Sequence, residues 1–155
     1  MAFEMLLERS PFHLAPFATL VLLALLFLAA GFDIVQRKVP NTLIAGGLAI
    51  AFVLAVMSGW SGLGRMASGS IAALMILLPV YASGMMGAGD VKLISMVGGF
   101  LGLHHFLFAL LCIFIAGGIL SALFLWRPQL SNDSAGVPYA VAVLGGMSAY
   151  LALLR

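Results

Sequence analysis

Two aspartates stand out in a chain that is otherwise almost wholly apolar. Asp33 and Asp90 each lie at the edge of a long apolar run. A carboxylate beside the hydrocarbon layer of a membrane is costly, so its presence there indicates a function. Two carboxyl groups at close range cannot both stay ionised, and such a pair therefore holds an acid and a base at one pH. An ionised carboxylate can activate a water molecule while a protonated one donates to a peptide carbonyl oxygen, which is the chemistry of amide hydrolysis.

The composition indicates which class of protein carries this pair. Of the 155 residues, 64% are hydrophobic and 8% are charged, whereas soluble domains carry roughly a quarter charged residues. We therefore predict one integral membrane domain over residues 1–155, with the lipid bilayer as its surroundings. The scattered charges, net +2, form no basic patch for nucleic acid. Cys112 is the single cysteine, which excludes an internal disulfide and a paired-cysteine metal site.

The apolar runs predict an all-α, polytopic membrane protein with about six transmembrane helices. A crossing takes ~20 residues, and the fourth run is the weakest because Gly98, Gly99 and Gly102 interrupt it. Residues 1–13 read as a short interfacial helix that ends at Pro11. The predicted helices cover residues 14–35, 42–59, 66–84, 91–103, 105–126 and 136–154, within a few residues at each end.

The helix count places both aspartates on one side of the membrane. Two predicted helices separate Asp33 from Asp90, so both carboxyl groups belong to the same leaflet. Arg37 and Lys38 follow the first helix, while its N-terminal flank carries two glutamates and one arginine. The positive-inside rule then predicts an N-terminus outside the cell and both aspartates at the cytoplasmic face of the inner membrane. A cleaved signal peptide over residues 14–31 is the rival interpretation, and it lacks the expected positive N-terminal flank.

The segments around the two aspartates add a second signal. Gly87 and Gly89 flank one small residue directly before Asp90, and Lys92 follows two positions later. Glycine permits unusual backbone angles and close approach by another chain, as an extended substrate strand would need. Asp33 is followed after five residues by Val39, Pro40 and Asn41, and the stretch from Gly136 through Pro138 to Ala140 lies near the start of the last predicted helix.

Together these segments resemble the Gly-x-Gly-Asp intramembrane aspartic peptidases, and most closely the type IV prepilin peptidases. The resemblance implies an endopeptidase that removes the leader of a type IV pilin-like precursor, with Asp33 and Asp90 as the catalytic pair. The implied partner is a pilin precursor in which a basic leader precedes a hydrophobic helix. Longer family members carry a cysteine-bearing cytoplasmic domain associated with methyl transfer. This chain is similar to the short, peptidase-only branch that serves tight-adherence (Flp-type) pili, so no methyltransferase activity is expected, and the archaeal preflagellin peptidases remain an alternative.

Other residues are candidates for shaping the site. Asn41 is placed to cap the second helix after Pro40 ends the first. Lys92 is interpreted either as a partner of Asp90 or as a positive-inside anchor. The resemblance adds Pro138, Gly87 and Gly89. No metal ligand set and no cofactor are predicted, because water activation here needs only the carboxyl groups.

Simpler interpretations exist for each aspartate and for the whole chain. Asp33 can form an i,i+4 ion pair with Arg37, and Asp90 can simply stabilise the start of a helix. At the level of function, the alternatives are a small proton-coupled carrier and a non-catalytic assembly subunit of the membrane. A carrier is expected to place its acids nearer the middle of the bilayer, within broken helices of an inverted repeat. The sequence leaves the oligomeric state and the assignment of acid and base open.

Overall fold

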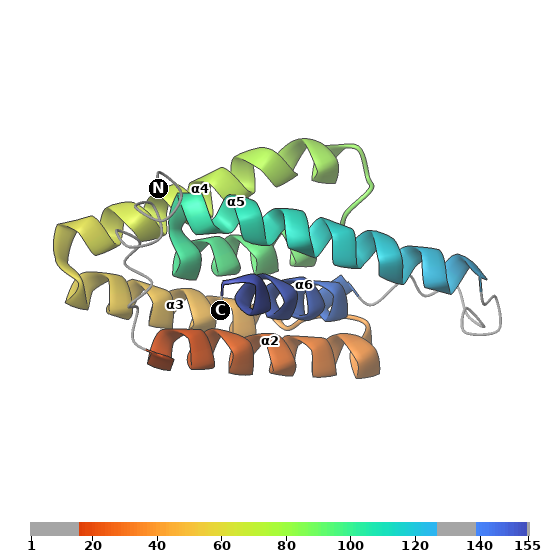
Figure 1. The fold of residues 1–155 in the computed structure, drawn as a ribbon, viewed down its shortest axis with the longest axis horizontal. Helices are drawn as coiled ribbons and strands as arrows, with labels where there is room; N and C mark the ends of the chain where they lie inside the picture. The colour runs from red at the N-terminus through yellow and green to blue at the C-terminus, as the bar shows by residue number, and fades with distance from the viewer. Residues whose placement is uncertain (1–15, 127–138, 155) are drawn as a thin grey trace.

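The structure is a computed structural model that describes residues 16–126 and 139–154 (Figure 1). Within these ranges all regular structure is helical, as predicted. The expected interfacial helix over residues 1–13 and the loop from 127 to 138 lie outside the described residues. The helices are α2 (Pro16–Gln36), α3 (Asn41–Met57), α4 (Gly59–Ala82), α5 (Ala88–Trp126) and α6 (Tyr139–Leu153).

Helix α5 consists of two halves that meet at Gly102. This residue has φ 73° and ψ 168°, a conformation that is open to glycine and closed to residues with a Cβ atom. The chain reverses direction there, so residues 88–101 and 103–126 run side by side in opposite senses (Figure 1). The halves correspond to the fourth and fifth predicted helices, and the break falls on one of the glycines that weakened the fourth.

The first half of α5 is the centre of the bundle. Every residue from 93 to 102 is buried, as expected of a helix that is apolar on all sides. Helix α4 packs against it in the antiparallel sense, with Gly69 opposite Gly98, and α3 packs alongside it with Gly47 against the side chain of Met96. Close backbone approach at small residues is the usual way in which helices pack within lipid.

These packings gather helix ends at one end of the bundle, toward which the last turn of α5 also runs (Figure 1). The last turns of α2 and α4 and the first turns of α3, α5 and α6 all lie there, at the right of the bundle in Figure 1. Asp33 and Asp90 occupy two of these turns, so we call this the aspartate end. The N-terminus of α2 and the junction between α3 and α4 lie at the opposite end.

The helix surfaces fit a membrane protein. Three segments are long and apolar enough to cross a bilayer, namely Phe17–Gln36, Gly59–Ala82 and Ala88–Leu123. Large apolar side chains point outward, including Phe27 at 65% exposure and Phe108 at 61%. Helices α3 and α6 have 17 and 15 residues. Residues 88–101 of α5 span about 21 Å at 1.5 Å per residue, against a hydrocarbon core of about 30 Å. The count of six crossings therefore stays a prediction.

One predicted boundary is wrong by about two helical turns. The third predicted helix was expected to begin near residue 66, whereas α4 begins at Gly59. The polar, glycine-rich stretch before residue 66 is typical of a loop. In the structure a single residue, Ser58, separates α3 from α4, and Gly59 takes a positive φ of 73° to make the turn. A Cβ atom on Gly62 would collide with the carbonyl of Ala55, so this stretch is helical because its glycines permit the tight corner.

Candidate active site

The two aspartates come from different helices and converge at the aspartate end. Asp33 lies in the last turn of α2, where its side chain is 8% exposed. Asp90 is half-buried in the first turn of α5. The carboxyl group of Asp90 interacts electrostatically with that of Asp33. The structure thus brings together two acids that are 57 positions apart in the sequence (90 minus 33).

Asp33 is held from across the bundle. The backbone N–H of Ala140, in the first turn of α6, donates a hydrogen bond to Oδ2 of Asp33 at 2.8 Å. The helix that carries Asp33 ends one turn later, where the N–H of Arg37 donates to the Asp33 carbonyl at 3.0 Å and Arg37 takes a left-handed φ of 54°. The acid is therefore fixed through its side chain by α6 and through its backbone by the end of α2.

Asp90 is held by the turn that starts α5. The carbonyl of Gly87 accepts hydrogen bonds from the N–H groups of Asp90 at 3.1 Å and Val91 at 3.2 Å. A Cβ atom on Gly87 would lie 3.3 Å from Oδ2 of Asp90, whereas a Cβ atom on Gly89 would meet no described residue within 4 Å. Gly87 thus leaves room for the carboxyl group itself, and Gly89 borders open space.

Lys92 and Asn41 form a link between α5 and α3. Lys92 Nζ donates to Oδ1 of Asn41 at 3.4 Å. The capping position expected for Asn41 is wrong, because Pro40 is the N-cap residue and Asn41 is the first residue of α3, with no side-chain cap bond. The Asn41 amide has this other partner from α5. The link joins the segments that follow the two aspartates, while any contribution of Lys92, Pro40 or Asn41 to activity stays a prediction.

The first turn of α6 adds a residue that the sequence did not single out. Tyr139 is half-buried and lies within electrostatic range of Asp90. Its ring packs over Gly117 of α5, where a Cβ atom would lie 3.2 Å from Tyr139 Cε2. Tyr139 and Ala140 belong to the segment around Pro138 that resembled the family, which was the available signal. Pro138 itself lies outside the described residues.

The arrangement supplies two neighbouring carboxyl groups that can serve as an acid and a base. Asp33 and Asp90 are the only acidic side chains in the described ranges. Within those ranges no group of three or more His, Cys, Asp or Glu side chains could hold a metal ion. Proton exchange between the two carboxyl groups and a water molecule is the reaction that these residues can perform.

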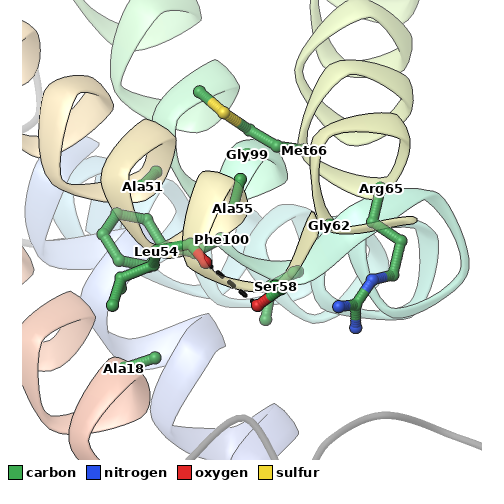
Figure 2. A pocket seen from close by; sticks show the side chains of 11 residues that line it. Ala18, Ala51, Leu54, Ala55, Ser58, Gly62, Arg65, Met66, Gly99 and Phe100 are labelled. Atoms are coloured by element: carbon green, nitrogen blue, oxygen red, sulfur yellow. Dashed lines mark hydrogen bonds between the residues drawn. The ribbon is translucent and has the colours of Figure 1, made fainter. Parts of the chain in front are cut away.

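A small pocket, whose lining side chains are drawn in Figure 2, lies at the opposite end of the bundle, between the first turns of α2 and α4 and the last turn of α3. Its wall includes Ala18 of α2, Ala55 of α3, Arg65 of α4 and Phe100 of α5. Ser58, at the junction of α3 and α4, donates to the carbonyl of Leu54 at 2.9 Å beside it (Figure 2). No carboxyl group lines this pocket, and we do not assign the reaction to it.

Comparison with known families decides the class of the protein. Residues 20–122 match the sequence model of Peptidase_A24, the type IV leader peptidase family. The chain belongs to the type IV leader peptidase family. The matched range contains Asp33, Asp90 and the glycines before Asp90, and it ends before the Pro138 segment. The family resemblance drawn from the sequence is thus confirmed, and the chain is a peptidase by family. Neither a search of curated proteins nor a search of solved structures found a match.

Proposed function

We propose that this member of the family is an aspartic endopeptidase that removes the leader peptide of a pilin-like precursor, of the Flp type. The observation that carries the proposal is the convergence of Asp33 and Asp90, electrostatically coupled, at one end of the bundle. Family membership supports leader peptide cleavage in general. The proposal includes six membrane crossings, an inner-membrane location and an active site at the cytoplasmic face.

The proposed reaction uses the two carboxyl groups and one water molecule. One aspartate accepts a proton as the water oxygen attacks the scissile carbonyl carbon, and the other donates a proton to the carbonyl oxygen. Water reaches the pair from the aspartate end, where the helices stop and turns begin. The nearness of both side chains in one place is what distinguishes this proposal from two unrelated polar residues at helix ends.

The proposed substrate is a precursor whose basic leader is followed by a hydrophobic helix. The outward-facing apolar side chains of α2 to α5 suit a partner that lies in the same bilayer. The segment to be cut must leave its helix and extend, because a peptide bond inside a helix is shielded by its own hydrogen bonds. The open space beside Gly89 is where we place that extended segment.

The test is co-expression of the protein with a candidate Flp-type precursor. We expect the wild type to shorten the precursor, and Asp33→Asn and Asp90→Asn each to reduce cleavage at least about 100-fold, the scale of general acid–base catalysis. Ser148→Ala is a matched polar control, because among residues 16–126 and 139–154 this exposed hydroxyl donates to the Leu144 carbonyl of its own helix alone. Precursor size on a gel and enzyme level in the membrane are the measurements. Substantial cleavage by either Asn variant would refute the pair.

A further inference from the structure

The first turn of α6 treats the two aspartates differently. Ala140 donates its backbone N–H to Asp33 Oδ2 at 2.8 Å in a buried position. Tyr139, the preceding residue, instead stands within electrostatic range of Asp90. Two consecutive residues of α6 thus interact with different aspartates. Of these two residues, Ala140 alone donates a hydrogen bond to a carboxyl oxygen.

A donor N–H at this distance favours the ionised form of the carboxyl group that accepts it. Hydrogen bonds to a charged acceptor are roughly twice as strong as neutral ones, and burial strengthens them further. Ala140 belongs to the first turn of a helix, where the aligned peptide dipoles also favour a negative charge. The surroundings of Asp33 therefore stabilise the ionised form of its carboxyl group.

Helix dipoles alone would favour the opposite assignment. Asp33 lies in the last turn of α2, where the dipole disfavours an anion, whereas Asp90 lies in the first turn of α5, where it favours one. The Gly87 backbone, in the turn just before α5, also donates a hydrogen bond to the Asp90 carboxyl group and favours its ionised form, but burial and the nearby Asp33 charge act more strongly in the opposite direction. The Ala140 bond is the only hydrogen bond from a separate helix that meets either carboxyl group within the described residues. A short, directed bond outweighs a dipole that acts diffusely over a terminal turn.

The remaining charged and titratable groups around Asp33 do not reverse the preference for an ionised Asp33. Helix α6 contributes Tyr139 at this end, and its other tyrosine, Tyr150, bonds to His105 at the far end. Helix α3 carries no titratable side chain. Helix α5 contributes Asp90 itself and Lys92, whose Nζ donates to Asn41. Arg37 and Lys38 follow Asp33 on its own chain, and their positive charge favours an ionised Asp33.

We infer that Asp33 is the ionised member of the pair and acts as the base, that Asp90 is the protonated member and acts as the acid, and that the Ala140 amide is the positioning group that sets this order. Asp33 takes the proton of the attacking water, and Asp90 gives its proton to the carbonyl oxygen, which leaves a neutral gem-diol. Asp33 then returns its proton to the amide nitrogen as the carbon–nitrogen bond breaks, and Asp90 recovers a proton from one hydroxyl. The products are one carboxylic acid and one amine, with both aspartates restored.

Carboxyl NMR of the full chain tests this assignment directly. The chain contains three aspartates, Asp33, Asp90 and Asp133, so cell-free synthesis with aspartate labelled at the side-chain carbon gives three signals. Single Asp→Asn variants assign them at alkaline pH, where all are ionised. In lipid nanodiscs we expect the Asp33 signal to stay in its ionised position to lower pH than the Asp90 signal, with midpoints at least about one pH unit apart. Asp90 ionising first, or both signals moving together, would overturn the inference.

A pair of substitutions at one position tests the amide. Ala140→Pro removes the donor N–H in a first helical turn, where proline is tolerated, while Ala140→Gly keeps it. We expect the Asp33 midpoint to move upward by about one pH unit in the proline variant and to stay in place in the glycine variant. An unchanged Asp33 midpoint in folded Ala140→Pro would refute the role of the amide. If the proline variant does not fold, the wild-type titration still decides the assignment.

The inference rests on the proposed function, and different experiments can refute each of them. Protonation is read from NMR signals without any substrate, whereas the proposed function is read from precursor cleavage. Suppose that cleavage requires both aspartates but that Asp90 is the one that is ionised at rest. This result would reject the assignment of acid and base and would keep the proposed peptidase function. Cleavage that survives Asp33→Asn would reject the peptidase mechanism whatever the titration gives.

Discussion

At the scale of single residues, the two glycines before Asp90 have different surroundings although the sequence presents them as equals. Gly87 has the Asp90 carboxyl oxygen 3.3 Å from where a Cβ atom would stand, and Gly89 has no described residue within 4 Å. Gly87 therefore leaves room for the Asp90 carboxyl group, whereas Gly89 borders the space in which we place the substrate.

This difference predicts a kinetic distinction. Gly87→Ala should lower kcat about tenfold, because the added methyl group displaces the Asp90 carboxyl group by a few tenths of an ångström and catalysis is steeply sensitive to such shifts. Gly89→Ala should act mainly on KM, because its methyl group enters the proposed substrate space. Steady-state cleavage of a purified precursor provides both constants. Gly145→Ala, which also has open space around it, is the control. Equal effects of the two motif variants on kcat would contradict this reading.

The sequence singled out the two aspartates that the structure brings together, but not the contacts that hold them. Asp33 and Asp90 were predictable because an acid beside an apolar run is rare and each lies within a recognisable segment. The Ala140 donor was not predictable, since a backbone N–H has no signature in the residue type. The Lys92–Asn41 bond was missed for a related reason, because it depends on α3 and α5 running side by side in the same direction, which hydropathy does not report.

At the scale of elements, the position of Asp90 depends on how closely α4 approaches the first half of α5. The helices meet at Gly69 and Gly98, where a Cβ atom on Gly98 would lie 2.5 Å from the Gly69 carbonyl oxygen. Ser70 adds a hydrogen bond across the same interface to the carbonyl of Ser95 at 3.2 Å. The central helix that begins at Asp90 is thus packed against α4 by backbone contact.

Two glycines of α4 allow a matched test of this packing. Gly69→Ala should destabilise the protein by about 1–3 kcal/mol, the usual cost of overpacking, because the new methyl group collides with the Gly98 carbonyl. Gly64→Ala, on the same helix and in open space, should leave stability unchanged or slightly raised. Thermal unfolding in detergent, followed by loss of helical circular dichroism, measures both. A Gly69→Ala variant as stable as Gly64→Ala would show that the interface is loose.

Hydropathy predicted these elements well where the chain is uniformly apolar and less well at the turns. Helices α2, α3 and α6 lie close to their predicted ranges, because lipid requires long apolar helices and little else. The start of α4 was misplaced because glycines near Gly59 and Gly62 were read as a loop. A glycine looks the same in the sequence whether it lies in a loop or at a tight corner between two helices. The two cases differ in whether a neighbouring helix packs against the glycine, which the sequence does not show.

At the scale of the whole molecule, the bundle has an aspartate end and an opposite end, and each carries strongly exposed side chains. Met85, between α4 and α5 at the aspartate end, is 81% exposed, and Trp60, at the start of α4 at the opposite end, is 90% exposed. These residues can report which end faces the cytoplasm.

The predicted orientation can be read with single cysteines. In a Cys112→Ala background, Trp60→Cys should react with a membrane-impermeant maleimide in intact spheroplasts. Met85→Cys should react only after permeabilisation, because the positive-inside rule applied to Arg37 and Lys38 predicts a cytoplasmic aspartate end. Gel-shift detection of the adduct is the measurement. The reverse labelling pattern would place the pair outside the cell and would contradict the proposed cytoplasmic cleavage.

The bond between Asp33 and Ala140 joins positions 107 residues apart, and this separation imposes an order on biogenesis. The ribosome makes both aspartates before it makes α6, so the growing polypeptide contains the proposed catalytic pair before the amide that holds Asp33 exists. If the pair is catalytic as proposed, we therefore expect the protein to become active only once α6 has been made and packed against α2.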